Sequence, residues 1–336
     1  MTSVPLETIL TRTEFNTWVL RQREQVKHAL NSLLPDTAPA RLAGAMRHSV
    51  FSGGDFLRAL LVMAARDAVT GSAAAALRAA VAIELVYAGS RSHQDLPCMD
   101  VGSVETARPS VYMMYGETLS LLAGNANVAL AFDALTADRA VPAVMQARLC
   151  SLLAGAAGHN GLAGGQAIEA TEPTALLSNT ELRDLHTRKT SALLQANILM
   201  GAACGDAPKG AVAALRDYAN AIGLAVCVVN DIHNASPNRD TSSPVFDAAV
   251  CDTPSFVAIL GEQAARSYAA TLRASAQQAL VRSGLPSTEL LSRIADMLVD
   301  PNGRATVPLQ TAASRLDQRQ LGDIQPCWGV TVASCN

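Results

Sequence analysis

The chain has 336 residues, of which 49% are hydrophobic and only 4% aromatic, and its formal net charge is −3. This length allows one large domain or two ordinary ones, each able to bury a core. A slightly negative chain lacks the basic surface that binds nucleic acid or an anionic membrane, so neither is expected as the main partner. Alanine-rich tracts dominate the first half. Because alanine is the strongest helix former, the composition favours an all-α fold.

The cysteines and the apolar runs bear on the compartment. Seven cysteines, without CxxC or Cys/His spacing, indicate buried thiols in a reducing compartment rather than disulfides. The N-terminus carries Glu7 and Glu14 and lacks the basic-then-apolar order of a secretion signal. Apolar runs such as residues 60–65 stop at Arg66 and Asp67, short of the roughly 20 residues that a membrane helix needs. We therefore expect a cytoplasmic protein without an integral membrane segment.

Apolar residues recur at three- and four-residue spacing along most of the chain, as the helices of a buried bundle require. The first amphipathic helix is expected over residues 13–33, and a short second helix ends at 52–54. Further helices are predicted over residues 57–69, 74–93, 109–135, 142–157, 160–170, 179–204, 209–234, 254–283 and 286–299. Strand-like alternation is nearly absent. The pattern predicts one helical domain over residues 1–300, with 301–336 as a C-terminal extension of unknown structure.

One interior stretch differs from the rest. Residues 235–254 are rich in Pro, Ser, Asp and Asn, which is a loop composition. Loops of this length inside a compact domain are usually functional or disordered. This loop directly follows an acidic cluster at Asp231.

Two acidic clusters stand on long apolar helices, one around Asp95 and Asp100 in "HQDLPCMD" and the other around Asp231. In an antiparallel bundle two such helices can face each other, and their carboxylates can hold Mg²⁺, a hard cation that takes oxygen ligands. Spacing alone favours the simpler interpretation that each cluster marks a solvated helix end. The flanking residues change that balance.

Six stretches occur in a fixed order: "GGDFLRALLVMAA", "AIELVYAGSRSHQDLPCMD", "RPSVYMMYGETLSLLAGNANVALAFDAL", "GGQAIEAT", "LHTRKTSALL" and "GLAVCVVNDIHN". Over roughly residues 50–265 this set resembles the trans-isoprenyl diphosphate synthases, whose motifs are G-G-K-R-x-R-P, D-D-x-x-x-x-D, G-D-x-L, G-G-Q, K-T and D-D-x-x-D. The resemblance implies an antiparallel helical bundle of the isoprenoid synthase type with a central apolar cavity. Two Asp-rich motifs would bind Mg²⁺ and an allylic prenyl diphosphate, and a basic pocket would bind isopentenyl diphosphate. It also implies a homodimer, with a heterodimer possible.

The acceptor pocket departs most from the family pattern. Asp55 and Phe56 stand where the family has Lys and Arg, and only Arg58 of that motif survives. The family's His on the next helix and the Arg pair after the first Asp motif are replaced by Tyr87, Glu105 and Thr106, with Arg108 just beyond. Each charge-assisted hydrogen bond to a phosphate contributes about 1.5–3 kcal/mol, so losing three or four weakens acceptor binding by powers of ten. The new carboxylates should also repel a diphosphate.

The allylic half is better retained. The resemblance assigns diphosphate binding to Lys189, Thr190, Gln166, Arg58 and Arg108, while Glu169 stands where the family has Asp. It assigns the metal to Gln94, Asp95, Asp100, Asn230, Asp231 and Asn234. The amide side chains among these keep an oxygen that can bind a hard cation, although they lack its charge.

Two further patterns point to a terpene synthase. Asn230, Asn234 and Asn238 follow at i, i+4 and i+8, which is similar to the N-D-x-x-S-x-x-x-E motif of class I terpene synthases. Alternatively, these asparagines cap a helix end, and Pro237 takes Asn238 out of helical register. Gly89 and Ser90 occupy the positions that set the cavity floor in the family, and small residues there imply a C15 or C20 substrate. Alternatively, they only let two helices approach closely.

Aromatic residues are expected to line the cavity, where their ring faces can stabilise a carbocation. These are Phe56, Tyr87 and Tyr112, beside Gly89 and Ser90 at the floor. Together the patterns predict a class I terpene synthase, with Asp95, Asp100, Asp231 and Lys189 as catalytic residues. Two alternatives stay open: a weakly active or regulatory subunit of a heteromeric prenyl diphosphate synthase, and a prenyltransferase with an acceptor other than isopentenyl diphosphate.

Overall fold

The structure is a computed structural model that describes residues 10–52, 56–99, 109–171, 178–235 and 255–299. Within these ranges the chain is helical and contains no strand, which confirms the predicted all-α class. The loop predicted over residues 235–254 falls, after Ala235, outside the described residues. The same holds for the extension over 301–336, so its separation from the helical domain stays a prediction.

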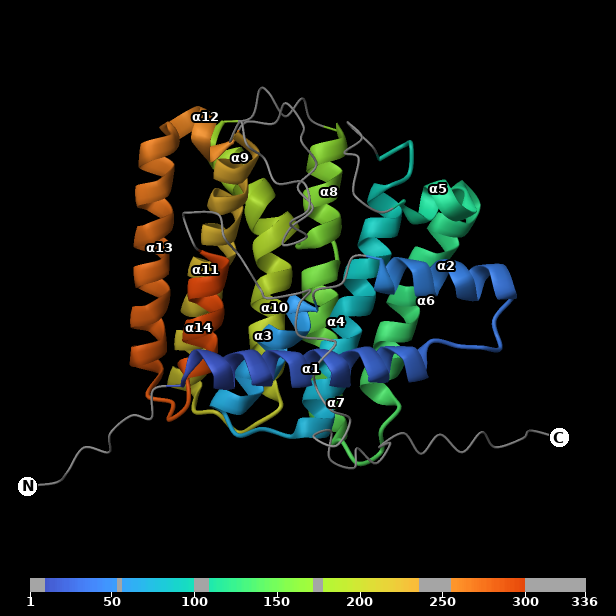
Figure 1. Cartoon of the computed structure of the whole chain (residues 1–336), viewed down its shortest axis with the longest axis horizontal. Helices are drawn as coiled ribbons and strands as arrows, with labels where there is room; N and C mark the ends of the chain where they lie inside the picture. Colours follow the sequence, from blue (N-terminus) through green and yellow to red (C-terminus); the bar gives the residue numbers. More distant parts are fainter. Residues whose placement is uncertain (1–9, 53–55, 100–108, 172–177, 236–254, 300–336) are drawn as a thin grey trace, which may run out of the picture. The chain divides into compact units, whose positions relative to one another are not determined.

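The helices are labelled in chain order in Figure 1. The first half contains α1 (Arg12–Leu33), α2 (Ala40–Phe51), α3 (Leu57–Ala68), α4 (Ala73–Gln94), α5 (Val111–Tyr115), α6 (Glu117–Thr136) and α7 (Ala143–Ala157). The second half contains α8 (Leu162–Thr171), α9 (Asn179–His186), the π-helical turn η2 (Thr187–Ser191), α10 (Ala192–Ala203), α11 (Lys209–Ala235), α12 (Phe256–Leu260), α13 (Glu262–Ser283) and α14 (Glu289–Leu298).

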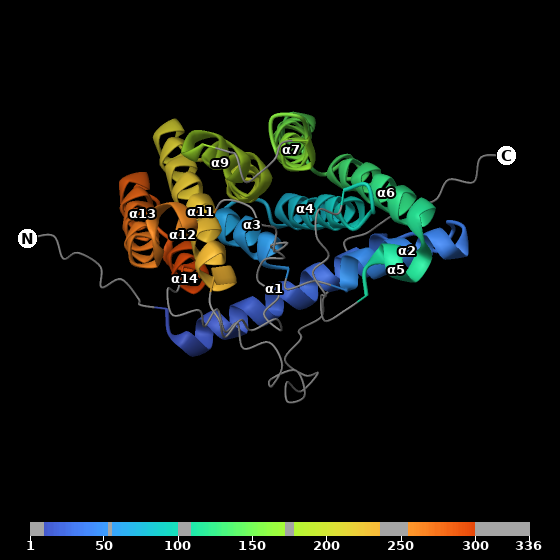
Figure 2. The same cartoon turned by 90° about the horizontal axis from the view of Figure 1, so that it is seen from above.

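The long helices pack in pairs: α4 lies against α6, α10 against α3, and α11 against both α10 and α13. The helices α1 and α2 cross these long helices, as both views show (Figures 1 and 2). The C-terminal ends of α4, α8 and α11 lie at one end of the bundle, where α12 also lies (Figure 1). That end brings together the sequence motifs at the end of α4, on α8 and at the end of α11.

Two predicted helices are each broken in two, which corrects the ranges 109–135 and 254–283. The breaks lie at Gly116, with φ +83°, and at Gly261, with φ +80°. Only glycine adopts this backbone conformation without strain, and it stops the helical hydrogen-bond ladder. Apolar periodicity continues on both sides of each glycine, so the periodicity alone did not reveal the breaks.

Small residues let the helices approach closely. A Cβ on Gly201 of α10 would lie 2.2 Å from the carbonyl oxygen of Val62 in α3. A Cβ on Gly89 of α4 would lie 2.8 Å from the carbonyl oxygen of Gly124 in α6. The alanine-rich composition therefore produces a bundle with short distances between helix axes, in which leucine and isoleucine fill the remaining space.

Three helices among the described residues are long and apolar enough to cross a membrane by length and composition alone. They are α4, α11 and α6, and within the bundle α4 buries 78% of its most apolar window whereas α6 buries only 39%. Single charged residues interrupt each apolar run without lowering the average hydropathy of the whole helix, so runs and whole helices give different impressions. The absence of an integral membrane segment stays a prediction.

Candidate functional site

The residue Lys189 lies in the π-helical turn η2, where it forms a close ion pair with Glu169 of α8. Its Nζ donates to both carboxylate oxygens of Glu169 at 2.7 Å. The two side chains are only 20% and 17% exposed. Gly165 of the G-G-Q stretch makes this possible, because a Cβ there would lie 2.7 Å from the backbone nitrogen of Lys189. The glycine thus has a structural reason that the motif alone did not supply.

The carboxylate of Asp231, near the end of α11, accepts a hydrogen bond of 2.7 Å from the backbone N–H of Phe256. Burial raises the pKa of Asp231 to about 6, and this hydrogen bond only partly offsets the effect. The half-buried carboxylate therefore lacks a sufficient counter-charge. A bound cation would supply one.

The ring of Phe256 stacks on the ring of His186, with 5.4 Å between centroids. The buried position of His186, and next the positive charge of Lys189, lower its pKa to about 4. Its imidazole is therefore neutral near pH 7. Thr190, which follows Lys189, is half-buried and lies close enough to the buried thiol of Cys227 on α11 to act against the rise that burial causes in the pKa of that thiol.

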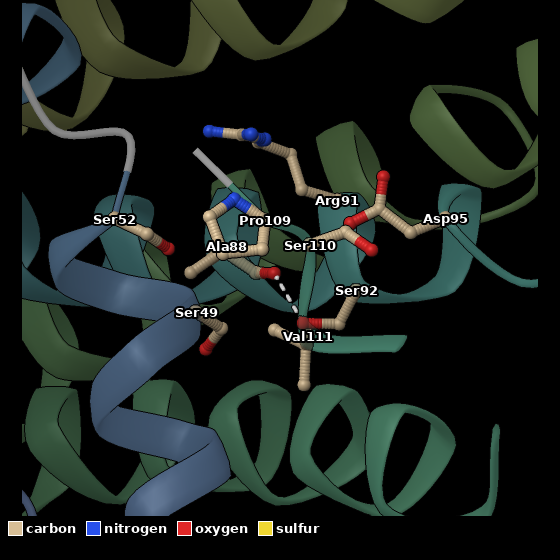
Figure 3. A pocket seen from close by; sticks show the side chains of 9 residues that line it. All are labelled: Ser49, Ser52, Ala88, Arg91, Ser92, Asp95, Pro109, Ser110 and Val111. Carbon is tan, nitrogen blue, oxygen red and sulfur yellow. Dashed lines mark hydrogen bonds between the residues drawn. The ribbon is translucent and has the colours of Figure 1, made fainter. Parts of the chain in front are cut away.

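The residues at the end of α4 divide between two faces. Ser90 accepts a hydrogen bond of 2.9 Å from Nε2 of Gln166 on α8. Gln94 follows Ser90 by one helical turn and so continues the same face. Asp95 instead lines a pocket on another side of α4, together with Arg91, Ser49 of α2 and Ser110 before α5 (Figure 3). The structure therefore brings Gln94, and not Asp95, to the side of α4 that faces Gln166 of α8.

The acceptor side of the predicted site is built from the start of α3 and the middle of α4. Phe56, which precedes α3, is 7% exposed and has a left-handed backbone with φ 49°. The guanidinium carbon of Arg58 lies 3.1 Å from the centre of the Tyr87 ring. The amide of Ala59 donates to the carboxylate of Glu84 at 2.9 Å. A phenyl ring, a stacked arginine and a buried carboxylate thus surround the start of α3.

Two predicted cavity residues lie elsewhere. Tyr112 on α5 is 37% exposed, so it lies at the surface and the prediction that it lines the cavity is wrong. The break at Gly116 makes α5 a separate five-residue helix, in which Val111 is buried while Tyr112 and the two methionines after it are exposed. Gly89 faces Gly124 of α6 at close range, as the helix-approach alternative required, while Ser90 faces α8.

The model of the polyprenyl synthetase family matches residues 39–298 of the chain. The chain belongs to the polyprenyl synthetase family. It is 31% identical over 275 residues to the heterodimeric geranylgeranyl pyrophosphate synthase large subunit 1 of Arabidopsis thaliana, which covers 80% of this chain and 74% of that protein. It is 32% identical over 280 residues to geranylgeranyl pyrophosphate synthase 11 of the same plant, and this match covers 80% of this chain and 77% of that protein.

Among solved structures, an FPP/GFPP synthase from Zymomonas mobilis is 28% identical and superposes with a TM-score of 0.75. The match covers 86% of this chain and all (100%) of that one. The bundle is therefore the isoprenoid synthase fold of the polyprenyl synthetase family. Family membership also explains why the motifs on α4, α8, η2 and α11 occur in their order along the chain.

Several site predictions lie outside the described residues. These are Asp55, Asp100, Glu105, Thr106, Arg108 and Asn238, and the side chain of Asn234. Their assignments as metal or diphosphate ligands, or as replacements in the acceptor pocket, remain predictions from the sequence.

The donors that remain at the end of α11 suit a hard cation. Asp231 offers a carboxylate and Asn230 beside it an amide oxygen, and oxygen donors are those that Mg²⁺ prefers. Within the described residues no group of three His, Cys, Asp or Glu side chains comes together. The partly uncompensated carboxylate of Asp231 is the observation that fits Mg²⁺, and the amides around it would lower the affinity for the cation.

Proposed function

We propose that this member of the polyprenyl synthetase family is a class I terpene synthase acting on an allylic prenyl diphosphate of C15 or C20 length. The diphosphate would bind at the end of the bundle where α4, α8, η2 and α11 meet. The observation that carries the proposal is the buried ring of Phe56, an apolar side chain where a prenyl transferase of this family has a cation for its acceptor. The site for the ionising substrate keeps its cation, Lys189.

The ion pair of Lys189 supports a role in holding the diphosphate. An ammonium has three N–H donors, and Glu169 accepts two of them. Glu169 therefore fixes the position of the ammonium while one N–H can donate to a diphosphate oxygen. A charge-assisted hydrogen bond of this kind strengthens as negative charge builds up on the leaving group.

Mg²⁺, when bound by Asp231 with Gln94, Asn230 and Asn234, would supply positive charge that stabilises the leaving pyrophosphate. On the protein side, Gln166 and Ser90 hydrogen-bond to each other and so fix the α4–α8 contact beside this region. The interior below it is apolar, which excludes water from an allylic cation and allows it to rearrange before it is quenched. The reaction ends by proton loss or by capture of water.

The decisive experiment incubates purified protein with Mg²⁺ and C10, C15 or C20 allylic diphosphates, with and without isopentenyl diphosphate. A hydrocarbon or an alcohol formed from the allylic substrate alone is the expected result. Elongation of the chain by isopentenyl diphosphate would refute the proposal.

A reversal of the acceptor substitutions provides a matched control. The double variant Asp55→Lys with Phe56→Arg restores two cations, and it should gain elongation activity that the unaltered chain lacks. Arg58 on Tyr87 would then act beside them. If the double variant folds, binds the allylic substrate and still fails to elongate, the acceptor site was not lost through these two residues.

A second candidate is a subunit of a heteromeric prenyl diphosphate synthase. It is favoured by similarity to a relative named as the large subunit of a heterodimeric geranylgeranyl pyrophosphate synthase. The uncharged residues Gln94 and Asn230 at metal positions also favour it. In the incubation above, this candidate predicts no product until an active prenyl synthase is added, and then a change in the rate or the chain length of that partner.

In the terpene synthase proposal, the chain forms a homodimer through α5 and the N-terminal half of α6. Four large apolar side chains are exposed there: Met113 at 74%, Met114 at 54%, and Leu121 and Leu122 at 45% each. The low burial of α6 noted above agrees with an uncovered face. A second copy of the chain presents the same apolar face, so the contact can be symmetric.

A cytoplasmic location is also proposed, and it rests on the composition of the chain alone.

A further inference from the structure

The ring of Phe256, the first residue of α12, lies between two aromatic rings from other helices. Its centroid is 5.4 Å from that of His186 in α9, with 27° between the planes, and 6.1 Å from that of Tyr268 in α13, with 51° between the planes. Phe256 is only 4% exposed. Aromatic pairs at such distances attract each other beyond the effect of the area that they bury. This aromatic cluster of His186, Phe256 and Tyr268 therefore holds the short helix α12 against α9 and α13.

A second residue of α9, Arg183, contacts the other end of the aromatic cluster. Its guanidinium carbon lies 5.6 Å from the centre of the Tyr268 ring, and one of its N–H groups donates to the Tyr268 hydroxyl. A guanidinium within about 6 Å of a ring centre is attracted to the face of that ring. Arg183 and His186 are three residues apart and so lie on one face of α9. That face thus contacts α12 through His186 and α13 through Arg183.

The backbone of Phe256 contacts the candidate metal site directly. Its N–H donates to Oδ2 of Asp231, near the end of α11, at 2.7 Å. The first N–H groups of a helix have no partner within the helix, and the hydroxyl of the N-cap Ser255 accepts from Ala258. The N–H of Phe256 is therefore available to Asp231. Since the ring and this N–H belong to one residue, contacts that fix the ring also fix the donor.

The hydrogen bond from Phe256 determines which oxygen of Asp231 is left for a cation. A carboxylate has two oxygens, and here Oδ2 carries the bond while Oδ1 remains for the metal. A group that hydrogen-bonds to a metal-binding carboxylate sets its orientation, and the loss of such a group typically lowers metal affinity by about 10–100-fold. The aromatic cluster therefore lies one step behind the metal ligand.

We propose that Phe256 is a positioning residue for Mg²⁺: the aromatic cluster fixes its N–H, and this N–H orients the carboxylate of Asp231 so that Oδ1 faces the cation. The inference rests on the proposed function in so far as Asp231 binds Mg²⁺ there. An aliphatic side chain at position 256 would fill the same space, but it lacks the ring faces that His186 and Tyr268 contact. The metal affinity thus depends on the ring of Phe256 and not only on its volume.

Binding of a cation in the absence of substrate tests the proposal. The probe is Mn²⁺, which takes the same oxygen ligands as Mg²⁺ and whose free form is measured by electron paramagnetic resonance. Phe256→Leu should raise the Kd for Mn²⁺ by about 10–100-fold. Tyr268→Leu removes a ring of the cluster from a different helix and should raise the Kd in the same direction. Tyr268→Phe keeps that ring and should leave the Kd unchanged.

Tyr218→Phe is the matched control for a loss of stability alone. Tyr218 lies on α11, the helix that carries Asp231, and its buried hydroxyl donates to the carbonyl of Leu291 at 2.7 Å. Loss of this bond should lower the melting temperature by a few degrees while the Kd for Mn²⁺ stays that of the unaltered chain. An unchanged Kd in Phe256→Leu, or an equal rise in Tyr218→Phe, overturns the proposal. An unaltered chain that binds no Mn²⁺ overturns it as well.

The Mg²⁺ requirement of turnover separates this inference from the proposed function. In Phe256→Leu, the Mg²⁺ concentration for half-maximal turnover should rise by about 10–100-fold, whereas kcat at saturating Mg²⁺ stays close to that of the unaltered chain. A lowered kcat with an unchanged Mg²⁺ requirement overturns the positioning role. If the unaltered chain converts no allylic diphosphate, the proposed function is refuted, and the Mn²⁺ titration alone decides the role of Phe256.

Discussion

At the scale of single residues, the two acidic motifs do not contribute equally. Asp231 is half-buried and short of counter-charge, while Asp95 lines a pocket on a side of α4 other than the one that faces α8. The sequence could not separate them, because a one-residue step along a helix turns a side chain by about 100° and the motif does not state which residue faces inward. The hydrogen bond between Ser90 and Gln166 shows which face of α4 points toward α8.

The first prediction compares Asp231→Asn with Asp95→Asn. Turnover of the allylic diphosphate should fall more than about 100-fold in Asp231→Asn, and within about tenfold in Asp95→Asn. The asparagine oxygen at position 231 can still accept from Phe256, so both variants should keep the circular dichroism spectrum of the unaltered chain. A greater loss in Asp95→Asn would show that the first acidic motif carries the metal.

The second prediction concerns the pH dependence of stability through His186. Its folded pKa of about 4 lies below the ordinary value of 6.5, so the unfolded chain binds the proton first as the pH falls. Its contribution is therefore fully present above about pH 6.5 and is lost towards pH 4, by up to about 3 kcal/mol. The raised pKa of Asp231 has the opposite effect: the folded chain binds this proton before the unfolded chain does, so Asp231 adds to the free energy of unfolding as the pH falls from about 6.

The comparison with His186→Gln separates the two groups, since the variant keeps Asp231 and Lys189. Denaturant unfolding between pH 4 and 8 should show a smaller loss of unfolding free energy on acidification in the variant than in the unaltered chain. Equal slopes in the two proteins would mean that His186 is protonated as readily in the folded chain as in the unfolded chain.

At the scale of elements, apolar periodicity was sufficient to place every long helix within a few residues. Apolar periodicity did not predict the breaks at Gly116 and Gly261 or the π-helical turn η2. At these places the backbone conformation changes while the apolar spacing continues. These interruptions lie around the site: one beside the exposed α5, one next to α12 and one at Lys189. The exposed position of Tyr112 follows directly from the first of them.

The third prediction concerns the contact between α4 and α6. A Cβ at position 89 would overlap the carbonyl of Gly124, so Gly89→Ala should lower the free energy of unfolding by about 1–3 kcal/mol. The preference for the chain length of the allylic substrate should stay unchanged, because this position faces α6. Ser90→Ala serves as the comparison: it removes the hydroxyl that accepts from Gln166, on the side of α4 that faces α8. A changed chain-length preference in Gly89→Ala alone would return Gly89 to the cavity wall.

At the scale of the whole molecule, the resemblance in the sequence predicted the family, whereas the surface required the structure. Nothing in the spacing of α6 showed that Leu121 and Leu122 are left uncovered.

The fourth prediction tests the apolar face of α5 and α6. The double variant Leu121→Glu with Leu122→Glu introduces charges that would be buried without partners in a dimer, so light scattering should show monomers at a concentration where the unaltered chain is dimeric. Val281→Glu is the matched control, because Val281 is 81% exposed on α13 and lies on another helix. If the unaltered chain is itself monomeric, the homodimer is refuted, and the exposed apolar face of α5 and α6 would contact a different protein.

The π-helical turn at Lys189 has a consequence for how this site can change. A turn of this kind contains one residue more than an α-helical turn, which shifts the facing of everything before it by about 100° relative to α10. Loss of a single codon between positions 187 and 191 would leave a continuous helix in which α9 is turned by about 100° relative to α10. Lys189 could then not keep its ion pair with Glu169 while Leu182 and Leu185 of α9 stay buried. The extra residue therefore couples the position of the ammonium to the packing of α9.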